Sequence, residues 1–365
     1  MKLTKKKTLL LGSILLAVGL LLILSILLFI GFDFTALNGE KLTLESVTVE
    51  DSFHSIRIDA DWINVTVAPQ NEGAATCVVT PKGLNLHTEI AVRDGVLVIE
   101  VKDVRPWHER ILFFAPEELS TITLYLPRAA YQSLHIDTNT GDVCVDSGTP
   151  DALFFGKTEV ETSTGDVFYH ADMPADTPFL VADTLGVVDL ITSTGDVTVC
   201  NTDVYVLLIY TSTGDVALTH SSARSCHMTT STGDLCLQGL QGDAESTTLT
   251  LFAETSTGDV TIADTALTGG EITTSTGDVT VSGGSTHTLS LITSTGDVEI
   301  LQYTADFMHV ETSTGDVLCD GISSKRFDIR TSTGDVECPP SAKKGDYCEI
   351  ETSSGDICII NTPVD

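Results

Sequence analysis

The chain has 365 residues, of which 42% are hydrophobic and only 6% aromatic, and its formal charge at pH 7 is −32. So many acidic groups would repel phosphate, which excludes a typical nucleic-acid-binding protein and argues against a peripheral protein of anionic membranes. Val, Ile, Leu and Thr abound, and this favours strands over a helical bundle.

The first thirty residues differ from the rest in kind. Four lysines in residues 1–8 precede an uncharged apolar run from Leu9 to Ile30. At a rise of about 1.5 Å per residue, this run is long enough to cross a hydrocarbon core of about 30 Å. We predict a basic cytoplasmic tail at 1–8, a transmembrane signal anchor at 9–30 and a tether at 31–45, with the rest of the chain outside the cell. A cleaved signal peptide is the alternative and leads to the same compartment.

Residues 46–136 alternate apolar and polar residues in several irregular stretches. IRIDADWINVTVAP begins at Ile56, GVLVIEVKD at Gly95 and TITLYLPRAAYQSLHI at Thr121. Alternation with period two is typical of strands with one buried face. We interpret this segment as a β cap and the opening coils of the body that follows, because the open end of a stack of strands is an unpaired edge.

Residues 137–365 repeat the motif T-[SN]-[TS]-G-D-[VLI] eleven times, with a base period of 19 residues. This period is too short for a helix-pair repeat or a propeller blade, and it fits one coil of a parallel β-solenoid. The sequence therefore predicts an all-β chain of roughly 19-residue coils after one transmembrane helix. The first threonines of the motif are Thr138, Thr162, Thr192, Thr211, Thr230, Thr255, Thr274, Thr293, Thr312, Thr331 and Thr352.

One coil, LSLITSTGDVEI from Leu289, shows how the motif should lie. Counting alternate residues back from Thr293 and Thr295 reaches Leu291 and Leu289, so both threonines should face the core and Ser294 should face outward. This parity argues against exposed threonine ranks of the kind that bind ice. The glycine supplies a backbone corner, and successive coils should stack in sequence order.

The chain resembles the bacterial putative-adhesin domain family. The features that carry the resemblance are FHSIRIDADWINVTV, then DGVLVIE, then ITLYLPRAAYQSLHI, then the recurrent [ST]-x-G-D-V motifs. They cover roughly residues 46–359. The resemblance implies a β-solenoid in the cell envelope and implies no catalytic residues. This chain departs from the family in the number and uniformity of its TSTGDV copies.

The aspartates of the motif should form a ladder along the stack. Charges about 4.8 Å apart repel, so each carboxylate should either accept hydrogen bonds at its corner or share a bridging cation such as Ca²⁺. The glycine-aspartate nonapeptide of calcium-binding β-rolls is absent, which favours the hydrogen-bond interpretation; no other cofactor is expected. The candidate calcium ligands are Asp196, Asp215, Asp234, Asp259, Asp278, Asp297, Asp316 and Asp335.

Catalytic motifs are missing from the sequence. It contains no HExxH, GxSxG or CxxC pattern, and the motif's aspartates recur eleven times, whereas a catalytic site is normally one exceptional place. A disulfide among Cys338, Cys348 and Cys358 stays open, because spacing cannot choose a pairing.

These observations predict a membrane-anchored, extracellular, adhesin-like or scaffolding solenoid that is not an enzyme. Its expected partners are the membrane, through the N-terminal helix, and a protein or envelope polymer, with self-association as a further expectation and no nucleic acid. A polysaccharide-active β-helix enzyme and an envelope-stress accessory protein are the alternatives.

Overall fold

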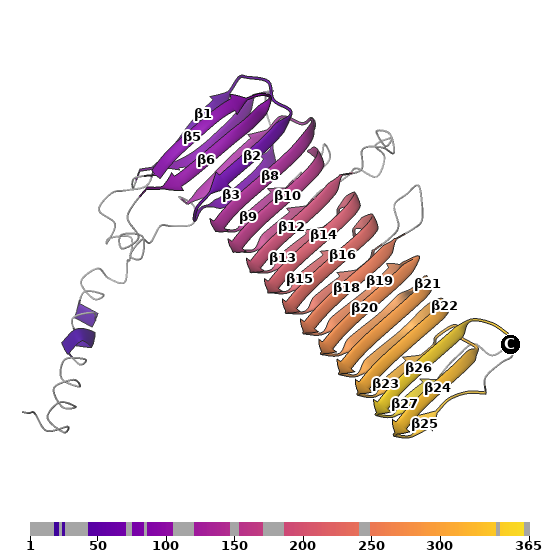
Figure 1. Ribbon diagram of the computed structural model, residues 1–365. Helices are drawn as coiled ribbons and strands as arrows, with labels where there is room; N and C mark the ends of the chain where they lie inside the picture. Colours follow the sequence, from indigo (N-terminus) through magenta and orange to yellow (C-terminus); the bar gives the residue numbers. More distant parts are fainter. Residues whose placement is uncertain are drawn as a thin grey trace, which may run out of the picture.

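The computed structural model describes residues 18–21, 24–25, 43–70, 75–83, 86–104, 120–146, 153–170, 186–240, 249–340 and 344–360. The strands stack into one long rod (Figure 1). Those of the N-terminal part are β1 (Thr43–Val49), β2 (Ser55–Ala60), β3 (Asn64–Pro69), β4 (Thr76–Lys82), β5 (Leu86–Arg93), β6 (Val96–Asp103), β7 (Thr121–Leu126), β8 (Ala130–Thr140) and β9 (Val143–Asp146).

The repeat region supplies the remaining strands. They are β10 (Phe154–Thr164), β11 (Val167–His170), β12 (Val187–Thr194), β13 (Val197–Cys200), β14 (Asp203–Thr213), β15 (Val216–Thr219), β16 (Ser222–Thr232), β17 (Leu235–Gln238), β18 (Thr250–Thr257), β19 (Val260–Ala266), β20 (Gly269–Thr276), β21 (Val279–Thr295), β22 (Val298–Thr314), β23 (Val317–Asp320), β24 (Arg326–Thr333), β25 (Val336–Glu337), β26 (Tyr347–Ser354) and β27 (Ile357–Ile360).

Each coil of the repeat region has a strand that leads into TSTGDV and a strand that leaves it. The leading strands pair in parallel with the leading strands of neighbouring coils, and the leaving strands do the same. Pairs such as Val279 with Val298 lie one 19-residue period apart. The predicted all-β parallel solenoid of roughly 19-residue coils is therefore confirmed.

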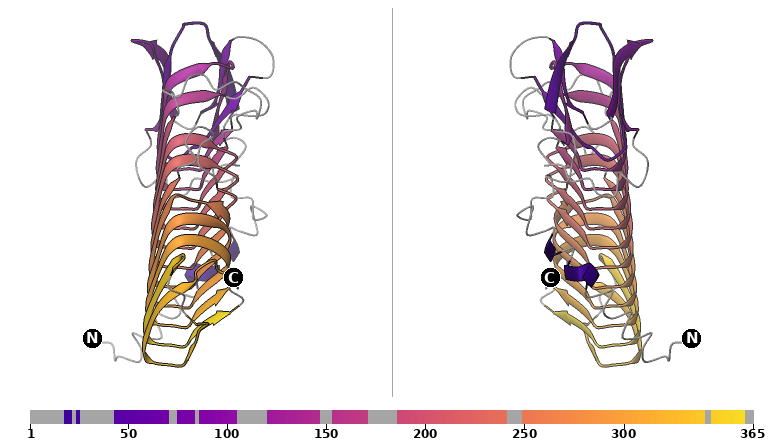
Figure 2. Two further views of the ribbon diagram at one scale, coloured as in Figure 1. Left: turned by 90° about the vertical axis from the view of Figure 1, so that its right-hand side faces the viewer. Right: turned by 90° about the vertical axis from the view of Figure 1, so that its left-hand side faces the viewer.

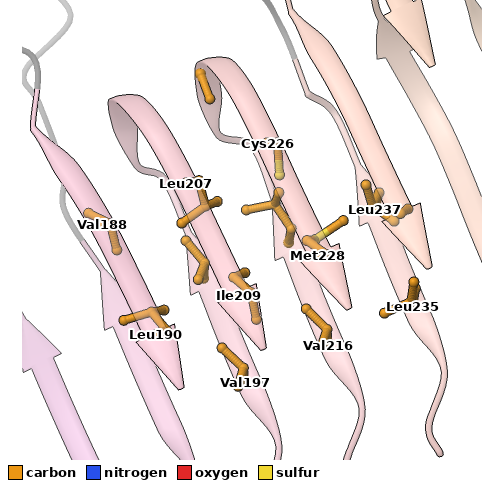
Figure 3. Packing of buried hydrophobic residues seen from close by; sticks show 14 of the residues in the cluster. Val188, Leu190, Val197, Leu207, Ile209, Val216, Cys226, Met228, Leu235 and Leu237 are labelled. Atoms are coloured by element: carbon orange, nitrogen blue, oxygen red, sulfur yellow. The ribbon is translucent and has the colours of Figure 1, made fainter. Parts of the chain in front are cut away.

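Apolar side chains from the two sets of strands meet inside the rod (Figure 3). Leu190 and Ile209 come from leading strands, and Val197 and Val216 from leaving strands; all four have at most 1% of their surface exposed. Burying such a side chain contributes about 1.5–3 kcal/mol. Because one coil has nothing to close its two open edges, the core forms only when coils stack.

The N-terminal end of the rod is closed by antiparallel strands. β2 lies between β6 and β8, and β3 pairs with both β7 and β9, so the first coil in sequence is not the outermost coil. β5 then pairs antiparallel with β6, and β4 bridges β7 and β1 in the same antiparallel sense. These additions shield the parallel edge at this end of the rod (Figure 1).

The C-terminal end departs from the expected sequence-order stacking. The last coil, β26 with β27, lies between the coil of β22 and β23 and that of β24 and β25 (Figure 1). Two prolines explain the exchange: Pro339 and Pro340 follow β25 and have no N–H for a ladder, so their coil suits the edge. Ile350 and Ile357 of the inserted coil are buried, as an interior position requires.

The predicted membrane anchor falls largely outside the described residues. Of residues 9–30, the structure describes 18–21 and 24–25, which are helical, and of the tether only the residues from Thr43 on. No helix within the described ranges is both long and apolar enough to span a bilayer. The basic tail at 1–8 lies outside those ranges as well.

Figure 2 shows the solenoid from its two sides.

Exchanging a corner glycine should unfold the stack locally. Gly277 has φ = 150°, and a Cβ there would lie 2.0 Å from the carbonyl oxygen of Gly258. We expect Gly277→Ala to lower the free energy of unfolding by roughly 3 kcal/mol or more, measured by denaturant unfolding. Gly269→Ala is the control, because its Cβ would meet only the hydroxyl of Thr288 at 3.3 Å. Equal effects of the two changes would contradict the corner's role.

Candidate functional site

The TSTGDV corner is built from hydrogen bonds between neighbouring coils. In the Thr293 coil, the threonine hydroxyl donates to the Gly277 carbonyl (3.3 Å), and the Gly277 N–H donates to the Thr295 carbonyl (3.0 Å). The same threonine bond recurs from coil to coil at 3.1–3.4 Å. The first threonine is therefore a core residue that satisfies a corner carbonyl.

The expected position of the second threonine is wrong. Thr293 has 2% of its surface exposed, as predicted, but Thr295 is exposed together with Ser294. The strand pairing passes from Thr293 with Thr312 to Thr295 with Thr314 and skips Ser294. The alternation of buried and exposed residues therefore ends at Thr293, although β21 continues to Thr295 and the bend follows at Gly296. Rows of exposed Ser and Thr consequently run along this corner.

The aspartates form a continuous ladder, in which each carboxylate except that of Asp335 in the last coil of the stack binds the backbone of the next coil. Oδ1 of Asp278 accepts the N–H of Asp297 at 2.8 Å, and the Asp278 N–H donates to Oδ1 of Asp259 at 2.8 Å. The ladder starts at the Asn64 side chain and runs through Asp142, Asp166, Asp196, Asp215, Asp234, Asp259, Asp278, Asp297, Asp316, Asp356 and Asp335, with distances of 2.7–2.9 Å.

This geometry gives each aspartate a structural role. Charge-assisted hydrogen bonds to N–H groups offset the repulsion between stacked carboxylates. All eight candidate calcium ligands lie in the ladder, but Asp335 contacts Asp356 and not Asp316, because the last two coils are exchanged. Within the described ranges, no three His, Cys, Asp or Glu side chains lie close enough to hold a metal ion. Calcium binding by the ladder stays a prediction.

A second feature lies on the outer face of the leading strands. Leu208, His227 and Phe252 are in register on β14, β16 and β18, and the rings of His227 and Phe252 stack at 4.6 Å with 6° between their planes. Tyr210, 36% exposed, lies 5.5 Å from the His227 ring, and Ile191 beside it is 37% exposed. We call these five residues the aromatic patch.

Acidic residues bound the aromatic patch along the rod. In the column of Leu208, His227 and Phe252, the preceding coil has Asp189 and the following coil Glu271. Burial, and then the charge of Glu159, raise the pKa of Asp189, whose Oδ1 is buried with no hydrogen-bond partner in the part of the chain that the structure describes. The patch thus lies between two acidic residues of its column.

Sequence analysis missed this patch. The signal was present as outward-facing His227 and Phe252, each three residues before the first threonine of its motif, with Tyr210 directly before Thr211 in the preceding repeat. None of Cys338, Cys348 and Cys358 is in a disulfide, so the pairing considered among them is not formed.

Comparison with known proteins places the chain in a family. It matches the family described as Toastrack DUF4097 over residues 53–250 and 245–363. The chain belongs to this family. This family membership agrees with the resemblance found in the sequence and with the repeated corner. No curated protein matches the chain.

Several solved structures are similar to this Toastrack chain at low identity. A "putative adhesin" from Parabacteroides merdae ATCC 43184 is 12% identical with a TM-score of 0.37, covering 87% of this chain and 97% of that one. One from Bacteroides fragilis NCTC 9343 is 14% identical with a TM-score of 0.29, covering 88% and 98%. A "putative cell adhesion protein" from Clostridium sporogenes ATCC 15579 is 8% identical with a TM-score of 0.20, covering 87% and 99%. At these values the structures do not indicate what this chain binds.

The aspartate ladder can be tested with two substitutions of one residue. Asp278→Ala removes the acceptor of the Asp297 N–H and should cost about 1 kcal/mol of unfolding free energy. Asp278→Asn keeps an oxygen acceptor and removes one charge from the row, so at low salt it should be at least as stable as the wild type. Ser294→Ala on the same corner is the control, with an expected change below about 0.5 kcal/mol.

The same proteins test the calcium hypothesis by thermal melting. If hydrogen bonds alone stabilise the ladder, millimolar calcium should shift Tm no more than sodium chloride of equal ionic strength. A rise of several degrees with calcium that Asp278→Asn reduces would establish a cation ladder instead.

Asp189 should make stability depend on pH. A carboxyl whose pKa is higher in the folded than in the unfolded state destabilises the fold when ionised, and this cost disappears as pH falls through the folded pKa. Asp189→Asn should therefore raise Tm at pH 7, and the gain should shrink towards pH 4. Glu271→Gln, at the other end of the aromatic patch, should have little effect at either pH. A Tm gain that is constant with pH would contradict this account.

Proposed function

We propose that this Toastrack protein is a membrane-anchored, extracellular, non-catalytic rod whose aromatic patch binds an uncharged carbohydrate polymer of the cell envelope. The observation that carries this proposal is the cluster of half-exposed aromatic and aliphatic side chains on four neighbouring coils. A cluster of this kind on a solvent-exposed face is typical of an interaction surface.

The spacing of the rings favours an extended polymer over a compact ligand. The rings of His227 and Phe252 face each other with centroids 4.6 Å apart, and the tilted Tyr210 ring lies 5.5 Å from His227, so the rings form an apolar ridge across the coils and not a closed cavity. Sugar rings present apolar faces that can pack against such a ridge, while Thr229 and Glu254 next to it offer hydroxyl and carboxylate groups for sugar hydroxyls.

The charge of the chain narrows the choice of polymer. A formal charge of −32 repels polyanions, so an uncharged glycan fits better than a phosphate-rich or uronic-acid-rich polymer. The aspartate ladder supports a non-catalytic role, because its carboxylates, apart from that of Asp335 at the end of the stack, have the same hydrogen-bonded position. The apolar run at 9–30 after the lysines supports the anchor and the outward orientation.

Affinity electrophoresis of the full-length chain in detergent would test the binding proposal. Gels containing a neutral glucan or mannan should retard the protein, and a uronic-acid polymer should not. Tyr210→Ala with Phe252→Ala should weaken retardation about tenfold in Kd, since each ring contributes about 0.5–1.5 kcal/mol beyond its buried area.

Phe168→Ala is the matched control, because this ring is 39% exposed on the leaving strands and lies outside the patch. No retardation by neutral polymers would overturn the proposal, and unchanged retardation of the double variant would remove the patch from it. Shortening of the polymer during the run would instead favour a polysaccharide-active enzyme.

The orientation can be tested on intact cells with a membrane-impermeant maleimide. Cys236 is exposed on the rod and should be labelled without lysis. Labelling that appears only after lysis would contradict the extracellular location.

A further inference from the structure

One place on the leaving strands breaks the uniformity of the repeats. Asp146, His170 and Cys200 are the last residues of β9, β11 and β13, and they lie in register on three successive coils. Nδ1 of His170 lies 3.2 Å from Sγ of Cys200. At the same position the next coils carry Thr219 and Gln238, so the arrangement is not part of the repeat.

From this geometry we propose that Cys200 is a reactive thiol, activated by His170, that forms a mixed disulfide with a low-molecular-weight disulfide. The thiol proton passes to Nδ1 of His170, and the Cys200 thiolate attacks one sulfur of the disulfide. A new S–S bond forms at Cys200, the old S–S bond breaks, and the leaving thiolate takes the proton from His170. The redox state is balanced, because one disulfide replaces another.

The surroundings fit this chemistry. Cys200 and His170 are half-buried, so a small reagent can reach the sulfur while the pair keeps a fixed geometry. The Phe168 ring lies parallel to the His170 ring, with 6.4 Å between centroids. On the coil of β9, Asp146 places a carboxylate in register with His170, where it favours the imidazolium that forms.

Other groups that face the pair are few among the described residues. β9 contributes Asp146 and the thiol of Cys144, whose pKa is raised by burial and then by the charges of Asp146 and Cys200. β15, on the other side of β13, contributes Ala217 and Thr219, which are uncharged. Cys144 therefore stays protonated more readily than an ordinary thiol, and Cys200 is the candidate nucleophile.

The chain contains its own controls for an experiment. Cys236 is exposed and has Ala217 and Thr261 as its register neighbours, so it reports on an ordinary accessible thiol. Cys226 is buried, and this burial raises its thiol pKa to about 12, so it reacts only if the rod unfolds.

The experiment treats the full-length protein with dithiodipyridine at pH 6 and measures the modification rate of each cysteine by peptide mass spectrometry. Cys200 should react about fivefold or more faster than Cys236, because the adjacent imidazole can take the thiol proton during the attack. His170→Gln should reduce the Cys200 rate to that of Cys236 and leave Cys236 unchanged.

Protection of Cys226 shows that a variant is folded. If His170→Gln exposes Cys226, Asp146→Asn replaces it and should lower the Cys200 rate at pH 6 while Cys226 stays protected. Equal rates of Cys200 and Cys236 in the wild type would overturn the proposal, as would a Cys200 rate unchanged in a folded His170→Gln protein. Neither result depends on carbohydrate binding.

Discussion

The structure depends on one close approach, that of each corner glycine to the carbonyl of the preceding corner. No side chain fits between Gly277 and the Gly258 oxygen, so the corners can stack directly on each other at the spacing of a β ladder. Once this spacing is set, the threonine hydroxyl, the aspartate carboxylate and the glycine N–H each find a backbone partner in the adjacent coil. The repetition of TSTGDV follows from the repetition of this contact.

The constraint also explains why the carboxylates tolerate one another. Their charges would destabilise a row of unpartnered acids, but each Oδ1 except that of the terminal Asp335 binds an N–H that would otherwise point outward from the corner. Function then has to be sought where the repeat is broken. Two such places stand out on the described surface, the aromatic patch on the leading strands and the Cys200–His170 pair on the leaving strands.

Much of the fold could be predicted from the sequence because it is periodic. The 19-residue spacing gave the coils, and the alternation before Thr293 gave the core. The second threonine was placed wrongly because the alternation of buried and exposed residues ends at Thr293, two residues before the strand ends at the corner. The exchange of the last two coils could not be predicted, because it depends on how each coil packs against its neighbours. Pro339 and Pro340 disfavour an interior position for their coil, but the local sequence does not show which coil takes that position instead. The aromatic patch was visible in the sequence, but the Cys200–His170 contact joins residues thirty positions apart across an insertion.

Hydrogen exchange of the motif's aspartate amides tests the central claim most directly. The Asp297 N–H lies on an exposed residue, yet it is bound to Oδ1 of Asp278 at 2.8 Å. The account predicts that this amide exchanges as slowly as those of the neighbouring strands, with and without a calcium chelator. Exchange at the rate of an open loop, or protection that disappears with the chelator, would contradict it.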